Sequence, residues 1–293
     1  MGDWGSAPTV LIFADSPEAS AFASERVAAT GGRIAATLPV DQAADRLDRQ
    51  IAVDLVIVDV VTDHGGELDR LFDRIETGAA AGRFAAIVMI APDLIDIASA
   101  RIGHDAVSLL AERDEAAFDM AIAERLRASE PQLRDKSEAE RGLPVQHILD
   151  EMARFVRDPD MVPSPDEDPL EPPRDIDDAT PVEAALIRDM IRARRLRDEL
   201  FGPGLFADPA WDILLDLTAA RIEGRSVAVS SLCIAAAVPA TTALRWIKQL
   251  TETGLLRRVA DPDDGRRIFI ELSDAAARRM MIYFANTFPA GRN

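Results

Sequence analysis

Cysteine is almost absent from this chain, since Cys233 is the sole cysteine among 293 residues. A single cysteine excludes an intrachain disulfide and a metal site built from several cysteines. The chain has no run of 18 apolar residues, which excludes a long apolar transmembrane helix. Its first residues have neither the basic cluster nor the apolar stretch of a signal peptide. We therefore expect a cytoplasmic protein with no membrane association.

Positive charge is also scarce, and it is unevenly distributed. The chain has 33 basic and 51 acidic residues, a net charge of −18. Residues 1–180 hold 17 basic and 37 acidic residues, a net charge of −20, whereas residues 181–293 hold 16 and 14, a net charge of +2. This asymmetry predicts a nearly neutral C-terminal domain joined to an acidic partner domain.

Recognisable catalytic motifs are missing. The three histidines, His64, His104 and His147, do not have the spacing of metal ligands. No phosphate-binding glycine loop and no Ser/His/Asp arrangement is present. The sequence therefore predicts no enzyme, no metal and no cofactor. Cys233 lies among core-type residues, so we expect a buried structural thiol rather than a redox switch.

In residues 8–130, apolar runs alternate with helical patterns five times. Strands are expected at 10–16, 33–38, 53–61, 84–91 and 106–110, and helices at 17–30, 41–50, 67–80, 93–101 and 114–128. This alternation predicts an α/β domain of the doubly wound, flavodoxin-like class with a parallel sheet.

Asp59 stands at the end of the third expected strand, at the sheet edge where parallel α/β folds place their chemistry. With this element order, residues 8–130 resemble the receiver domain of bacterial response regulators, which implies Asp59 as a phospho-acceptor candidate. Asp15 matches one acidic position of that family, but Ala14, Ala91 and Ala111 stand where a second acid, a hydroxyl residue and a lysine are usual. We therefore expect a pseudo-receiver; residual phosphorylation and a different α/β domain stay open.

Residues 131–180 separate the two expected domains. An amphipathic helix is predicted at 144–157, suited to docking on either domain or on a partner. Residues 158–180 carry nine acidic residues and six prolines, a composition that predicts an extended linker. The alternative is an acidic segment that mimics DNA and competes for a DNA-reading domain.

Residues 181–293 have the pattern of an α+β winged helix-turn-helix. Helices are expected at 181–201, 209–223, 231–237, 240–253 and 274–288, and strands at 255–259 and 267–272. Ser230 or Ser231 is expected to cap helix 231–237, and Ser273 the last helix. Gly254 is expected to end helix 240–253 with a positive φ. Helix 181–201 is a candidate dimerisation element.

The expected recognition helix 240–253 has one apolar stripe and one polar side. Its polar side is expected to carry Thr241, Thr242, Arg245, Lys248 and Gln249. Hydroxyl groups at a helix start bind phosphates, and arginine can bind guanine through two hydrogen bonds. These residues are therefore predicted to enter a DNA major groove.

The tip that follows, wing 260–267, contains Asp-Pro-Asp-Asp-Gly-Arg-Arg. Arg266 and Arg267 are predicted to reach a minor groove, where a neighbouring aspartate can hold an arginine in place. With this tip and the helix pattern, residues 181–288 resemble MarR-type transcriptional regulators. The resemblance implies a homodimer on palindromic double-stranded DNA. Ala237 departs from that family, which usually has glycine at this turn.

Together these features predict a homodimeric, sequence-specific transcriptional regulator. Its N-terminal domain would serve dimerisation or sense a protein partner. Two alternatives remain open: a signalling adaptor whose winged helix binds protein, and a response regulator controlled through Asp59.

Overall fold

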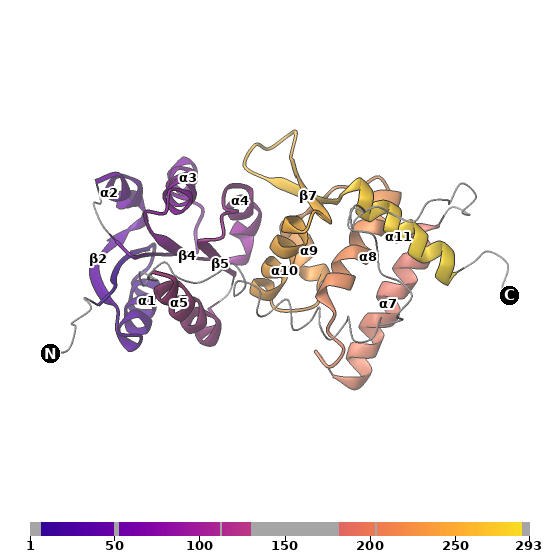
Figure 1. The fold of residues 1–293 in the computed structure, drawn as a ribbon, viewed down its shortest axis with the longest axis horizontal. Coiled ribbons are helices and arrows are strands. Elements are labelled where there is room, and N and C mark those ends of the chain that lie inside the picture. Colours follow the sequence, from indigo (N-terminus) through magenta and orange to yellow (C-terminus); the bar gives the residue numbers. More distant parts are fainter. Residues whose placement is uncertain (1–6, 50–52, 112, 130–181, 203, 289–293) are drawn as a thin grey trace, which may run out of the picture. The chain divides into compact units, whose positions relative to one another are not determined.

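The computed structural model describes residues 7–49, 53–111, 113–129, 182–202 and 204–288. The described parts of 1–129 and 176–293 belong to one compact unit. The predicted helix at 144–157 and linker at 158–180 lie outside the described residues. Two folded modules make up the described unit, an α/β domain and a winged helix (Figure 1).

The α/β domain is a five-stranded parallel sheet in the order β2-β1-β3-β4-β5. Its strands are β1 (Thr9–Ala14), β2 (Arg33–Pro39), β3 (Leu55–Val60), β4 (Ala85–Ile90) and β5 (Val107–Ala111). Its helices are α1 (Pro17–Ala29), α2 (Ala43–Arg49), α3 (Gly66–Ala80), α4 (Ile95–Arg101) and α5 (Glu115–Ser129), with short 3₁₀ turns before α2 and α4. The predicted doubly wound class is confirmed.

Alternation along the central strands builds two apolar layers. Leu11 and Phe13 of β1 join the layer that contains α3, whereas Val10 and Ile12 join the layer that contains α1 and α5. Successive side chains of a strand point to opposite faces, so β1, fully buried along Val10–Phe13, needs an apolar residue at every position. The continuous apolar run in the sequence has this cause.

The winged helix begins with α7 (Ala184–Phe201) and α8 (Pro209–Ile222). A short strand β6 (Val227–Ala228), helix α9 (Val229–Ala235) and helix α10 (Ala240–Glu252) follow. Strands β7 (Leu256–Ala260) and β8 (Ile268–Leu272) form the wing, and α11 (Asp274–Thr287) ends the described chain. The small antiparallel sheet has the order β6-β8-β7. As predicted, Ser273 caps the last helix through a bond from the Ala276 amide.

Two backbone positions explain the turns around α10. Gly254 has φ +73° after the helix end, as predicted. Ala237, in the turn between α9 and α10, has φ +53°, and no other non-glycine residue described here has a positive φ. The turn thus keeps the left-handed conformation that glycine favours, although the alanine side chain at this position disfavours that conformation.

The predicted serine cap of α9 is wrong. The helix begins at Val229 after Ala228, with no side-chain cap. The Ser230 amide and hydroxyl instead donate to the Asp96 carboxylate of α4, at 2.9 and 2.7 Å. The Asp96 carboxylate of the other domain thus accepts a hydrogen bond from an amide at the start of α9, which is what the side chain of a local cap would otherwise do.

Among the described residues, no single helix is long and apolar enough to cross a membrane. Taken together, α9 and α10 have the length and composition of a membrane-spanning segment, but the two helices are bent by 109° relative to each other. Most of their large apolar residues lie in the protein core, as expected for a helix-turn-helix, whereas Ile234 is exposed.

Candidate nucleic-acid interface

Helix α10 has the two-sided character expected of a recognition helix. Ala243, Leu244, Ile247 and Leu250 are buried. Thr242 and Arg245 are exposed, and Lys248 and Gln249 are half-buried. Helical spacing separates the two sets, so the buried residues fix the helix while part of its polar side stays accessible.

Thr241 differs from this pattern because its side chain is buried rather than accessible. Its hydroxyl donates to the Ala111 carbonyl at 2.7 Å and accepts from the Ala111 amide at 3.0 Å. Ala111 ends β5, the edge strand of the α/β domain. The start of α10 thus bonds to the sheet edge, with the hydroxyl predicted to contact a DNA phosphate.

The wing arginines lie in different surroundings. The guanidinium of Arg266 donates to both carboxylate oxygens of Asp63, at 2.8 and 2.9 Å, and to those of Asp69, at 3.1 Å. This hydrogen bonding raises the pKa of Arg266 and lowers that of Asp63. Arg267 is exposed and pairs with Asp264 in its own wing, at 3.5 Å. The predicted role of a nearby aspartate thus has a structural counterpart at Arg267.

Further polar contacts join the same two modules. Lys248 of α10 pairs with Asp105 at 2.8 Å. Arg258 of β7 donates to the carbonyl oxygens of Ser99 and Ile102, at 3.1 and 3.4 Å. Together with the bonds of Thr241, Ser230 and Arg266, these contacts involve both the recognition helix and the wing.

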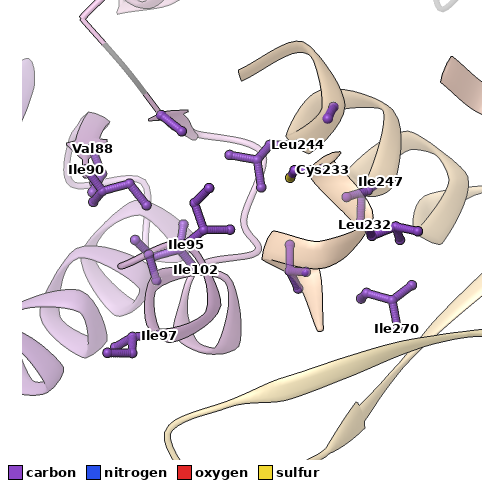
Figure 2. Packing of buried hydrophobic residues seen from close by; sticks show 14 of the residues in the cluster. Val88, Ile90, Ile95, Ile97, Ile102, Leu232, Cys233, Leu244, Ile247 and Ile270 are labelled. Carbon is purple, nitrogen blue, oxygen red and sulfur yellow. The ribbon is translucent and has the colours of Figure 1, made fainter. Parts of the chain in front are cut away.

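An apolar layer lies beneath these bonds. Helix α10 packs against β5, and α4 packs against α9 and β8. Figure 2 shows Ile95 and Ile102 of the α/β domain in the same cluster as Leu232, Leu244 and Ile270 of the winged helix. One continuous buried cluster thus spans both modules, as in the core of a single domain.

These contacts involve three of the side chains that the sequence predicts to contact DNA. Thr241, Lys248 and Arg266 already bind backbone or carboxylate oxygens of the α/β domain. A duplex placed along α10 and the wing would compete with that domain for the same donors. In the conformation described here, these three donors therefore already have partners in the α/β domain.

The Asp59 site is a second polar centre, at the carboxyl edge of the large sheet. Asp59 is 1% exposed, so its carboxylate is buried and not solvated at the end of the strand. Burial raises its pKa, although Arg113 lies 3.3 Å from the carboxylate and opposes that shift. Asp15 accepts from the amides of Val61 and Thr62, at 2.8 and 2.9 Å. Arg113 thus supplies a fixed positive charge beside Asp59.

Four residues with contacts at these sites were not predicted from the sequence: Asp63, Asp69, Asp96 and Arg113. The first three stand in acidic surroundings, where no local pattern marks a carboxylate that contacts a remote arginine or serine. Arg113 lies two residues beyond Ala111, the position taken as the equivalent of the receiver lysine. Its place just after the fifth strand is the signal in the sequence that marks it.

Cys233 is buried, in agreement with the predicted structural thiol. Burial raises the pKa of its thiol to about 12, with a smaller contribution from Asp96. Because thiolate is the reactive form, this thiol is poorly suited to redox chemistry near neutral pH. No group of three or more potential metal ligands is found among the described residues.

Comparison with known proteins agrees with the C-terminal geometry. Residues 211–276 match the family model described as a winged helix DNA-binding domain. The match runs from α8, through α10 and the wing, into α11. No curated protein matches this chain.

Several solved structures are similar to parts of the chain. A signal receiver domain of an HD domain-containing protein from Pseudomonas fluorescens Pf-5 is 17% identical, with coverage of 42% of this chain and 98% of that chain and a TM-score of 0.34. A probable transcriptional regulator from Pseudomonas aeruginosa is 28% identical, with coverage of 36% and 78% and a TM-score of 0.24. Wild-type MarR from E. coli is 16% identical, with coverage of 38% and 80% and a TM-score of 0.25.

Structural similarities with TM-scores this low add no argument to the assignment of residues 211–276 as a winged helix. It rests on the family match and on the observed order of helices and strands. Residues 211–276 thus match a winged helix DNA-binding domain and have the fold of a winged helix, and the same chain carries a doubly wound α/β domain with the strand order β2-β1-β3-β4-β5.

Proposed function

We propose that this protein is a sequence-specific transcriptional regulator whose α/β domain covers the DNA-reading surface in the closed state. Helix α10 would enter the major groove and the wing would contact the minor groove. The observation that carries the proposal is that the surface predicted to bind DNA also binds the α/β domain. The family-matched recognition helix and wing also hold Thr241, Lys248 and Arg266, which bond to the α/β domain. DNA binding would then require these bonds to break.

The α/β surface offers chemistry similar to a phosphate backbone. Asp63 and Asp69 present four carboxylate oxygens to Arg266, and Asp105 presents another to Lys248. DNA phosphates are bound by the same guanidinium and ammonium groups. The acidic N-terminal domain would therefore compete with DNA for these side chains. The protein would exist in an equilibrium between a closed form, in which the α/β domain holds them, and an open form that can bind DNA.

We also propose a homodimer, because apolar side chains are exposed on the helices outside the DNA-reading unit. The exposed large apolar residues there are Leu196, Leu200, Phe201, Leu205, Phe206, Tyr283 and Phe288. They lie on or beside α7 and α11. A second copy of this chain that covers them would place two recognition helices on one palindromic site, with centres about 34 Å apart.

Arg245 and Arg267 provide the direct test of DNA reading. Neither bonds to the α/β domain among the described contacts, and Arg267 pairs within its own wing. We expect Arg245→Ala to weaken binding to a site selected from random DNA by roughly 5- to 150-fold, with relaxed base preference at one position. Arg267→Ala should weaken binding and lower its salt dependence. Gel-shift titrations over a salt series measure both.

Arg74→Ala is the matched control, because it removes the same charge from an ion pair with Asp48 inside the α/β domain. It should leave DNA affinity nearly unchanged. If Arg245→Ala and Arg267→Ala both bind like the parent protein, the proposed DNA contacts are wrong. Arg266→Ala is a poor test, since it would remove a DNA contact and a closing contact together.

A second candidate function is an adaptor whose winged helix binds protein. The observation in its favour is that α10 and the wing already bind a protein surface, through Thr241 and Arg266. Selection from random DNA separates the two candidates. An enriched motif supports the regulator, and a pool with no enrichment favours the adaptor.

Control by phosphorylation is the remaining alternative, and we propose that Asp59 does not react. Its carboxylate is buried and faces the guanidinium of Arg113. We expect no mass gain when the protein is incubated with Mg²⁺ and a small phosphodonor such as acetyl phosphate, as measured by intact mass. A gain of one phosphoryl group that Asp59→Asn abolishes would instead establish a reactive receiver.

A further inference from the structure

Asp59 lies at the carboxyl edge of the large sheet, near two parts of the α/β domain that hold the winged helix. The loop that follows its strand, β3, carries Asp63, which accepts from Arg266 of the wing. The other part is the end of β5, where Ala111 bonds to Thr241 of α10. These two contacts with the winged helix therefore begin at the ends of β3 and β5.

The Arg113 side chain connects the ends of these two strands. Its guanidinium lies 3.3 Å from the Asp59 carboxylate, although β4 separates β3 from β5 in the sheet. The side chain thus reaches back across β4, since strands two places apart are separated by about 10 Å. Arg113 follows Ala111 by two residues, so their backbones are at most about 7 Å apart. Fixing the guanidinium at Asp59 therefore restricts the position of Ala111.

Ala111 needs such support because β5 is an edge strand. In the described sheet β5 pairs only with β4, so backbone groups on its outer side have no partner strand. The Thr241 hydroxyl binds both the amide and the carbonyl of Ala111, at 3.0 and 2.7 Å. Two bonds to one hydroxyl require a narrow range of positions, whereas strand ends open locally at a low cost in free energy. An anchor beside Ala111 thus favours its contact with α10.

The Asp59 carboxylate has the surroundings expected of such an anchor. It is buried, and a buried carboxylate that loses its cationic partner is strongly destabilising. The negative charge of Asp15 nearby adds repulsion, which Arg113 offsets. Asp15 itself accepts from the amides of Val61 and Thr62, in the loop that leads to the wing contact. The ion pair thus belongs to a polar cluster that fixes both strand ends.

We propose that Asp59 and Arg113 are positioning residues whose ion pair holds the α/β domain against the winged helix and thereby restricts access of DNA to α10. This role rests on the proposed function, because only a closed form that competes with DNA gives the ion pair an effect on DNA binding. The pair consists of two side chains of the chain itself and needs no phosphorylation of Asp59. Its loss should shift the equilibrium toward the open form, because the end of β5 is then free to leave Thr241.

Asp59→Asn and Arg113→Gln each remove the ion pair and keep a side chain of similar shape. The Arg113 side chain is 36% exposed, so solvent reduces the contribution of the pair. In the full chain without DNA, each variant should exchange the Ala111 amide proton about two- to fivefold faster than the parent. Hydrogen exchange followed by NMR measures this rate. Binding to a selected DNA site should tighten by the same factor in gel-shift titrations, since both changes follow one equilibrium.

The double variant and two controls separate positioning from a general loss of stability. Asp59→Asn with Arg113→Gln should have the effect of either single change, because both single changes remove one interaction. Amides of β1 should exchange as in the parent, whereas a merely destabilised fold would speed their exchange and would not tighten DNA binding. Asp48→Asn is the matched charge control, since Asp48 pairs with Arg74 at 2.9 Å within the α/β domain. It should leave the exchange of Ala111 unchanged.

The positioning role and the proposed function fail separately. Exchange at Ala111 that equals the parent rate in both single variants, or that rises equally in β1, overturns the positioning role whatever DNA does. Additive effects in the double variant also overturn it, because the two residues would then act independently. Faster exchange at Ala111 with DNA affinity no higher than that of Asp48→Asn overturns the control of DNA access. Failure to select any DNA site overturns the proposed function, and hydrogen exchange still decides whether the pair holds Ala111 against Thr241.

Discussion

Asp63→Asn combined with Asp69→Asn is expected to tighten DNA binding by the full chain, although neither residue belongs to the winged helix. The double change removes both carboxylates that hold Arg266. Arg266 is 31% exposed, so solvent screening limits the closing contribution to about 1–2 kcal/mol. A closed state weakened by that amount should bind a selected site roughly 5- to 30-fold more tightly. Gel-shift or anisotropy titration at fixed salt measures the change.

The control for this experiment must remove equal charge elsewhere. Asp45→Asn with Asp48→Asn does so on α2, where Asp48 pairs with Arg74 of the same domain. This control reports the general benefit of a less acidic protein. If both doubles tighten DNA binding equally, the wing contact has no specific closing role.

The pH for the DNA-binding titration is chosen from the pKa of Asp63, whose carboxylate pairs with Arg266 of the wing. The hydrogen bond from Arg266 lowers the pKa of Asp63. A lowered folded-state pKa means that the contact is fully present above the ordinary carboxylate range and is lost as pH falls through the lowered value. Titrations at neutral pH therefore compare variants with the parent contact intact.

Asp212→Ala is expected to have the largest effect on stability. Asp212 is 4% exposed and accepts from Arg194 at 2.6 Å, with Arg195 at 3.6 Å. Alanine would leave guanidinium charge partly buried without its carboxylate. The loss of a buried charge partner costs about 3 kcal/mol. Urea unfolding of the full chain should show a loss of that size in the free energy of unfolding, with a correspondingly lower midpoint.

An exposed ion pair supplies the comparison. Asp274→Ala removes the partner of Arg221, at 3.0 Å and largely in solvent, and should cost below about 1 kcal/mol. Equal loss in the two variants would show that Asp212 acts as an ordinary surface carboxylate. Asp212 of α8 pairs with Arg194 and Arg195 of α7, a helix of the proposed dimer surface. The Asp212 variant should therefore also weaken the proposed dimer.

The sequence predicted most of the fold because its signals are local. The apolar run at 53–61 could fit a buried parallel strand, and β3 occupies Leu55–Val60. The alternation of strands and helices then limited the topology to a doubly wound sheet. The wing was also predictable, because Asp-Pro-Asp-Asp-Gly has turn chemistry between two short apolar strands.

The closed interface was not predictable, because its contacts join residues far apart in the chain. The Ser230 and Asp96 pair illustrates the point. A serine at a helix start ordinarily predicts a local cap, yet here it donates to a carboxylate 134 residues away. Thr241 fits an exposed helix start equally well by pattern, and only the position of β5 buries it. Local patterns carry no information about such partners.

A disulfide across the two modules tests the central claim most directly. Asp96→Cys and Ser230→Cys, in a Cys233→Ser background, replace a contact between side chains whose oxygens lie 2.7 Å apart. Neither position is a proposed DNA contact. We predict that the oxidised, cross-linked protein fails to bind a selected DNA site, and that reduction restores binding to the level of the Cys233→Ser parent. Cross-linked protein that binds DNA as tightly as its reduced form would contradict the closed-state account.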